Sequence, residues 1–183
     1  MPPSPQLRFE KREKLNLAYQ HISVIPNPGG FGASIIGANL ARPLSQDVVA
    51  EIKAAWHAHG VVFFPDQDLD PGKLEGFTEA MGDYGHTEFV VPMDGHPNVL
   101  ELRREPEETA SHFGGGWHTD YTFQDKPPAA TILYGHIVPP VGGATPFADR
   151  RAAYLALSDK LTTFLADLPG IHSAALPYSN DGL

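Results

Sequence analysis

The sequence contains no cysteine, few basic residues and no long apolar run. Without cysteine, the chain has no disulfide, zinc-thiolate site, iron–sulfur cluster or thiol nucleophile, and we expect a cytoplasmic protein. Its 13 basic residues are outnumbered by 22 acidic ones, for a net charge of −9, which argues against the basic surface that a nucleic acid needs. No apolar stretch is long enough to span a membrane, and the polar, Pro-rich start lacks the apolar part of a signal peptide. We therefore expect no membrane association.

What is present favours one globular domain made of short elements. The chain has 183 residues, of which 42% are hydrophobic, so it is long enough to bury a core. Its 18 glycines and 18 prolines interrupt regular structure often. This composition favours strands and loops over long helices.

The hydrophobic periodicity predicts four helices. In the clearest one, Val48, Ile52 and Trp56 share a face between the N-cap Ser45 and the terminating Gly60. A second helix opens at Asp70-Pro71, a common start signal. The expected helices cover residues 45–60, 70–82, 149–157 and 158–169.

Short β-rich and alternating stretches predict strands between and after the helices. The clearest is AATILYGHIVP, in which apolar and other residues alternate. The charged segment at 104–111 is expected to be a surface loop. The predicted strands cover residues 21–26, 33–37, 61–65, 98–103, 129–139 and 145–147, so the chain is a mixed α and β protein.

One stretch carries candidate chemistry: GGGWHTDYTF at 114–123. If it is a strand, His118 and Asp120 point to the same side about 7 Å apart, while Trp117, Tyr121 and Phe123 form a packed outer face. Imidazole and carboxylate suit a divalent metal and form two-thirds of the 2-His-1-carboxylate triad of non-haem iron oxygenases.

Spacing alone does not decide the role of this pair. With nine histidines and 22 acidic residues, about one such pair is expected by chance, and a second one occurs at His86-Thr87-Glu88. The three glycines before Trp117 distinguish the first pair, because they allow the backbone to approach a cavity closely.

The motif and its surroundings resemble one known family. GWHTDYTF, PPAATILYG, VPPVGGATPFAD and RAAYLALS, together with HGVVFFPDQDLDP upstream, are similar to the taurine/2,4-dichlorophenoxyacetate (TauD/TfdA) dioxygenases. The resemblance runs in order from about residue 22 to 178. It implies an α+β fold, a double-stranded β-helix (jelly roll) with flanking helices.

The resemblance also implies cofactors and roles. It implies Fe(II) held by His118 and Asp120, 2-oxoglutarate contacted by the Thr145 hydroxyl, and a substrate contact from His86. The expected reaction uses O2 to hydroxylate a sulfonate, sulfate ester or aryloxy acid and releases succinate and CO2. Taken alone, Thr145 is better explained as a strand residue chosen for its β propensity.

The chain also departs from the family pattern. The third iron ligand of the family, a distal histidine, and the arginine that binds 2-oxoglutarate have no match among the residues after Asp120. His172 has no arginine after it, so we interpret it as an ordinary polar histidine. We expect residues 1–20 to be an irregular lead-in and residues 21–183 to be the N-terminal portion of a single dioxygenase domain, apparently incomplete at the C-terminus.

Two other interpretations stay open. The chain could be a catalytically incompetent remnant that folds with a partner, since a half-barrel with open strand edges favours pairing with another copy. It could instead be a zinc hydrolase that uses the same pair, for which turnover without O2 would be the evidence.

Overall fold

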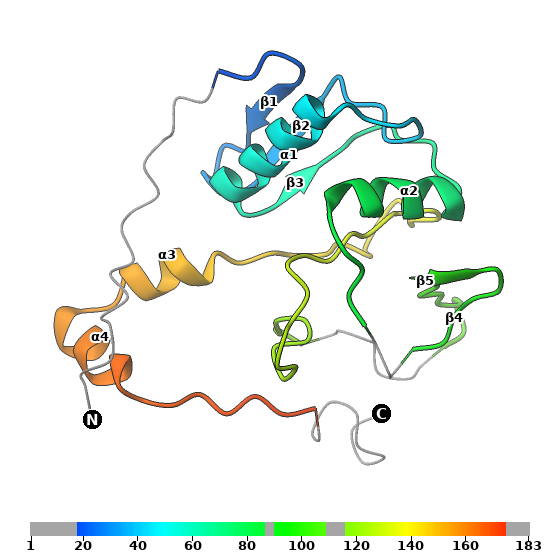
Figure 1. The fold of residues 1–183 in the computed structure, drawn as a ribbon. Coiled ribbons are helices and arrows are strands. Elements are labelled where there is room, and N and C mark those ends of the chain that lie inside the picture. Colours follow the sequence, from blue (N-terminus) through cyan, green and yellow to red (C-terminus); the bar gives the residue numbers. More distant parts are fainter. Residues whose placement is uncertain (1–17, 87–89, 109–115, 175–183) are drawn as a thin grey trace. The chain divides into compact units, whose positions relative to one another are not determined.

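A computed structural model describes residues 18–86, 90–108 and 116–174 (Figure 1). The chain forms two compact units. One comprises Met1–Asn39, Leu44–Gln67 and His136–Pro169, and the other Leu40–Pro43, Asp68–Gly135 and Gly170–Leu183. Neither unit is a continuous stretch of sequence, because the chain passes between them several times.

The first unit contains a three-stranded sheet in the order β1-β2-β3. Its strands are β1 (Ser23–Pro26), β2 (Ala33–Ile36) and β3 (Val62–Phe63). β1 and β2 form an antiparallel hairpin, whereas β3 runs parallel to β2 with Val62 opposite Ala33. Parallel strands need a crossover connection, and α1 (Gln46–His59) supplies it (Figure 1).

The core of this unit lies between β2 and α1. On β2, Ala33 and Ile35 are buried while Ser34 between them is not, as the two-residue period of a strand predicts. On α1, Ile52 and Ala55 are buried, and within the described residues Ile35 and Ile52 are the largest fully buried side chains. A small apolar interface therefore joins the helix to the sheet.

The ends of α1 are those that its sequence predicts. The Ser45 hydroxyl accepts a hydrogen bond from the Val48 N–H at 3.4 Å, which satisfies one of the free donors of the first turn. At the other end, Gly60 has φ of +82° and donates its N–H to the Trp56 carbonyl at 2.7 Å. The prediction of this helix is confirmed.

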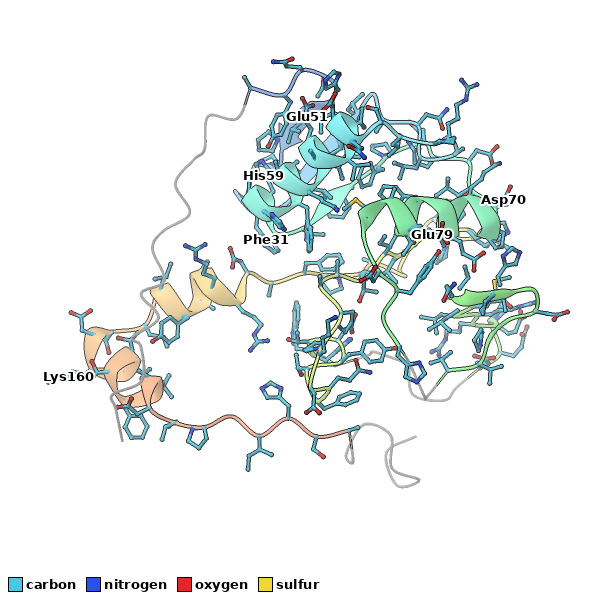
Figure 2. All side chains as sticks on the ribbon, viewed as in Figure 1. Phe31, Glu51, His59, Asp70, Glu79 and Lys160 are labelled. Carbon is cyan, nitrogen blue, oxygen red and sulfur yellow. The ribbon has the colours of Figure 1, made fainter. Side chains whose placement is uncertain are left out.

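The side chain of Glu51 on α1 holds the segment that enters β1 (Figure 2). Its carboxylate accepts backbone N–H groups from Gln20 at 2.7 Å, His21 at 3.0 Å and Ile22 at 3.1 Å. Desolvation acts to raise the pKa of this carboxyl, but the three N–H donors outweigh it and lower the pKa below its ordinary value.

Gly32 allows the β1-β2 hairpin to lie close to the start of β3. It adopts φ of +84°, accepts from Asn27 N–H at 3.0 Å and donates to the His59 carbonyl at 3.0 Å. A Cβ at this position would lie 2.8 Å from Asn27 Nδ2 and 3.1 Å from Val61 Cγ1. Any larger residue would therefore be strained here both in its backbone and by contact.

The later part of the first unit contains α3 (Arg150–Leu155) and α4 (Asp159–Ala166). Asp149 and Ser158 accept N–H groups of the first turns as N-caps. Neither helix has a buried residue; for example, Phe164 is 65% exposed. Among the described residues, no helix is both long and apolar enough to cross a membrane.

The second unit is built around α2 (Pro71–Met81) and the antiparallel pair β4 (Pro92–Met93) and β5 (His96–Leu100). Phe77 on α2 and Val99 on β5 are buried. Glu75 joins the two elements, since its carboxylate lies 2.8 Å from His96 Nδ1. This hydrogen bond lowers the Glu75 pKa.

The predictions for the second half of the chain are only partly confirmed. The strand expected at 98–103 is present but covers His96–Leu100. The strands expected at 129–139 and 145–147 are absent, and the described residues after Leu100 contain no strand at all. The physical reason is that a strand needs a neighbour for its ladder of hydrogen bonds, and these segments have none among the described residues. The described part therefore shows few of the strands of a jelly roll.

Candidate metal centre

His118 and Asp120 lie against each other in the second unit. His118 Nε2 is 3.0 Å from Asp120 Oδ1, and their side chains are 55% and 40% exposed. They do not lie on a strand, as the sequence pattern predicted; Gly116 to Asp120 form an irregular segment that leads into a turn. The two functional groups meet because the chain bends, and both remain accessible to a solute.

Each member of this pair is held by a further contact. His118 Nδ1 lies 2.8 Å from the Gly116 carbonyl oxygen, and the Thr131 hydroxyl donates to Asp120 Oδ2 at 2.6 Å. A carbonyl oxygen only accepts, so Nδ1 carries the proton and Nε2 of the neutral ring has a lone pair. Contacts of this kind orient the ligands of metal sites and fix the histidine tautomer.

The geometry of the pair fits a shared divalent cation. A nitrogen lone pair and a carboxylate oxygen that face each other at 3.0 Å repel unless a proton or a metal ion lies between them. Two ligands that bind one ion at right angles through bonds of about 2.1 Å are about 3.0 Å apart. The mixed nitrogen and oxygen set suits iron, zinc and other transition metals. Among the described residues, however, no cluster of three or more such side chains occurs.

The turn after Asp120 includes Tyr121 to Gln124. Tyr121 has a positive φ of 51°, which is uncommon for a residue with a Cβ, and its carbonyl accepts the Gln124 N–H at 3.0 Å. The Gln124 side chain donates to the His86 carbonyl at 2.8 Å. This contact brings the backbone of His86 to the metal-site turn, while Thr87 and Glu88 of the second sequence pair lie outside the described residues.

The aromatic residues of the motif do not form the packed face that was predicted. Trp117 is 75% exposed, so most of its ring faces solvent. Tyr121 and Phe123 are half-buried and contact each other, with ring centroids 6.0 Å apart. The prediction failed because it assumed the alternation of a strand, which the bend at this position removes.

Thr145 belongs to the first unit, where it is exposed and not in a strand. Two residues later the chain is anchored, because the ring of Phe147 packs edge-on against Phe63 of β3 with centroids 6.3 Å apart. The Phe147–Phe63 contact holds the chain near Thr145. The role of the Thr145 hydroxyl stays a prediction.

Two contacts at the site were missed in the sequence. Thr131 binds the Asp120 carboxylate across 11 residues, and His172 Nδ1 lies 2.8 Å from the Thr122 hydroxyl across 50 residues. The sequence pattern places Thr131 in a predicted strand and marks His172 as no more than an ordinary histidine. The one signal for Thr131 was its place in PPAATILYG, one of the segments that carried the family resemblance.

Comparisons with known proteins identify the family. Residues 23–180 match the model of the taurine catabolism dioxygenase TauD, TfdA family. The chain belongs to this family, as the motif resemblance implied. The match includes every residue of the candidate site.

Individual relatives agree with the family match. An alpha-ketoglutarate-dependent sulfate ester dioxygenase from Pseudomonas putida is 34% identical over 160 residues, which cover 87% of this chain and 52% of the relative. An (S)-phenoxypropionate/alpha-ketoglutarate-dioxygenase from Sphingobium herbicidovorans is 30% identical, over 87% and 55% of the two chains. This chain thus spans about half the length of these relatives.

A solved structure is also similar. A taurine dioxygenase from Burkholderia xenovorans superimposes with a TM-score of 0.73 and 36% sequence identity, covering 86% of this chain and 55% of that one. The structural neighbours of this chain are therefore dioxygenases of the TauD type.

Proposed function

We propose that this chain acts as part of an Fe(II)- and 2-oxoglutarate-dependent dioxygenase. The observation that carries the proposal is the contact of His118 Nε2 with Asp120 Oδ1 at 3.0 Å, inside the region that matches the family. Such an enzyme hydroxylates its substrate with O2 and releases succinate and CO2. The names of the relatives favour a small anionic substrate: a sulfonate, a sulfate ester or an aryloxy acid.

In the proposed metal centre, two residues would bind the iron and two further groups orient these ligands. His118 and Asp120 would hold the iron, while the Gly116 carbonyl and the Thr131 hydroxyl keep the two ligands turned toward each other. When bound, Fe(II) and 2-oxoglutarate supply the oxidising power for O2 chemistry. Two protein ligands leave positions open for the oxo acid and O2.

Two further residues are assigned by the family resemblance. The Thr145 hydroxyl would donate a hydrogen bond to a carboxylate oxygen of 2-oxoglutarate, a charge-assisted contact that suits a short side chain. His86 would contact the substrate; support for this role is that Gln124, from the turn after Asp120, binds its backbone carbonyl.

We also propose the domain organisation that the sequence suggested. Residues 1–20 are a lead-in, and residues 21–183 are the N-terminal portion of one double-stranded β-helix with flanking helices. The match over residues 23–180 and the similarity to about half of a taurine dioxygenase support this assignment.

A second candidate is that these 183 residues alone are catalytically incompetent. The absence of any three-ligand cluster among the described residues favours it. Two protein ligands bind iron weakly and do not fix the pose of 2-oxoglutarate. The two candidates make different predictions for the same experiment.

That experiment is an anaerobic titration of the chain with Fe(II) and 2-oxoglutarate, followed by its visible charge-transfer band. If the proposed enzyme operates in this chain, a band appears, His118→Ala abolishes it, and His57→Ala, a change of an exposed histidine on α1, retains it. Adding O2 with an alkyl sulfate, a sulfonate or a phenoxy acid then yields succinate. No band in the unchanged chain would support the incompetent alternative.

A further inference from the structure

The metal-site turn is tied to a distant segment of the chain. His172 Nδ1 lies 2.8 Å from the Thr122 hydroxyl oxygen, although 50 residues separate them. Both residues belong to the second unit, and Thr122 is only two positions after Asp120. The turn that follows the candidate ligand is therefore not held by its neighbours in sequence alone.

The His172 ring also lies near the backbone of its own segment. A Cβ placed on Gly170 would lie 3.5 Å from His172 Nε2, an ordinary contact distance, so the ring lies close to the backbone of Gly170. The absence of a side chain at Gly170 leaves the ring more room. The His172 ring therefore lies between the backbone of Gly170 and the hydroxyl of Thr122.

The backbone of the turn adopts an unfavourable conformation that a further contact would help to maintain. Tyr121 adopts φ of 51°, a conformation that persists in a non-glycine residue only where the surroundings impose it. None of residues 116–135 is fully buried, so this conformation is not imposed by a packed core. Beside the backbone bond from Gln124 to Tyr121, the side-chain hydrogen bonds from Gln124 to His86, from Thr131 to Asp120 and between His172 and Thr122 act as restraints.

We propose that His172 is a positioning residue for Asp120. Its hydrogen bond to Thr122 ties the 170–174 segment to the turn and limits the movement of the backbone that carries the Asp120 carboxylate. This inference rests on the proposed function in so far as Asp120 is a metal ligand. His172 itself is not in the ligand set, because no cluster of three ligand side chains is found among the described residues.

The first test uses the metal-free chain and the backbone amide signals of residues 120–124 in NMR spectra. His172→Ala and Thr122→Val each delete one partner of the hydrogen bond, and both should shift the same amide signals. His172→Asn places an amide group near the position of Nδ1 and should restore most of the original spectrum. His57→Ala is the control and should leave these signals unchanged. Unshifted amides in both deletion variants would overturn the inference.

The second test measures the affinity for Mn(II), counted as free ion by electron paramagnetic resonance. Loss of the hydrogen bond should weaken binding by about 3- to 10-fold, the effect of one net hydrogen bond. The double variant should be no weaker than either single one, since both remove the same contact. His172→Asn should recover most of the affinity.

The outcomes separate the possible roles. A loss in His172→Ala that far exceeds the loss in Thr122→Val, without rescue by His172→Asn, would make His172 a ligand and overturn the positioning role. If the unchanged chain takes up no Mn(II), the proposed metal centre fails for this chain. The amide signals of the metal-free variants still decide whether His172 holds the turn.

Discussion

The region around α1 and the segment that carries His118 and Asp120 are held in different ways. Around α1, buried side chains from the helix and β2 meet, and both ends of the helix are capped. In residues 116–135 no side chain is buried, and single hydrogen bonds such as Thr131 to Asp120 hold the chain. From this comparison we expect the region around α1 to contribute more to the stability of the fold, and the segment with His118 and Asp120 to carry the candidate chemistry.

This separation follows from what each region does. A core loses water on folding, and its apolar contacts add up to most of the stability of a domain. A metal site must stay reachable, and its polar ligands need defined orientations more than burial. Changes in the α1 region should therefore affect unfolding, whereas changes around Asp120 should affect metal binding and leave unfolding almost unaltered.

The largest expected effect is on stability, in the α1 core. Ile52→Ala removes a fully buried side chain and should lower the free energy of unfolding by about 2 to 5 kcal/mol. Urea denaturation followed by circular dichroism measures it. Leu161→Ala on α4, whose side chain is 41% exposed, is the control and should cost no more than about 0.5 kcal/mol. An equal loss of unfolding free energy in Ile52→Ala and Leu161→Ala would contradict the role assigned to the α1 core.

The next effect is on metal binding. Thr131→Val removes the hydroxyl that donates to Asp120 at 2.6 Å, and it should weaken Mn(II) binding about 10- to 100-fold, as changes next to metal ligands do. The urea midpoint should stay the same because Thr131 is exposed. Thr131→Ser keeps the hydroxyl and should keep the affinity. A shifted midpoint with unchanged affinity would reverse the roles assigned to the two regions.

A smaller effect is expected at the start of α1. Ser45→Ala removes the N-cap acceptor of the Val48 N–H and should cost about 1 kcal/mol of stability. Ser45→Asp keeps an acceptor and should keep the stability. Thermal unfolding of the three proteins provides the measurement, and a Ser45→Ala protein as stable as the unchanged chain would contradict the assigned cap.

The pH dependence of stability should come partly from Glu51. Its pKa is lowered in the folded chain by three backbone N–H donors, which outweigh the opposing effect of desolvation. A carboxyl whose folded pKa is lowered stabilises above its unfolded pKa, and this contribution is lost as the pH falls through the folded pKa.

Denaturation curves at a series of acidic pH values test this contribution. Glu51→Gln cannot titrate, so its stability should fall less steeply than that of the unchanged chain below the ordinary glutamate pKa. Glu101→Gln is the control, since Glu101 is exposed. If Glu51→Gln and the unchanged chain lose stability in parallel, the carboxylate does not hold the entry to β1.

The same comparison explains which features the sequence predicts. Helix α1 was predicted within one residue at each end, because its caps and its apolar stripe are local signals. The segment at 129–139 shows why the strands were not. Ile132 and Tyr134 are half-buried and Leu133 between them is exposed, so burial alternates here, yet no strand within the described residues pairs with the segment. Pairing depends on distant residues that a local pattern does not contain.

For the candidate site, the sequence likewise predicts the local pair of residues but not their distant contacts. The residue types and spacing of His118 and Asp120 indicated a metal pair, and the structure brings their functional atoms together. The bend that joins them and the contacts from Thr131 and His172 were not predicted, because these residues lie 11 and 50 positions from their partners. Whether the pair binds iron stays a prediction.

The most direct test of the account is whether His118 and Asp120 together hold a divalent metal. Mn(II) is titrated into the unchanged chain, His118→Ala, Asp120→Asn and the control His57→Ala, and free Mn(II) is counted by electron paramagnetic resonance. We predict that the unchanged chain and the control bind one ion with equal affinity, and that each site variant binds at least about 10-fold more weakly. Equal Mn(II) binding by all four proteins would contradict the account.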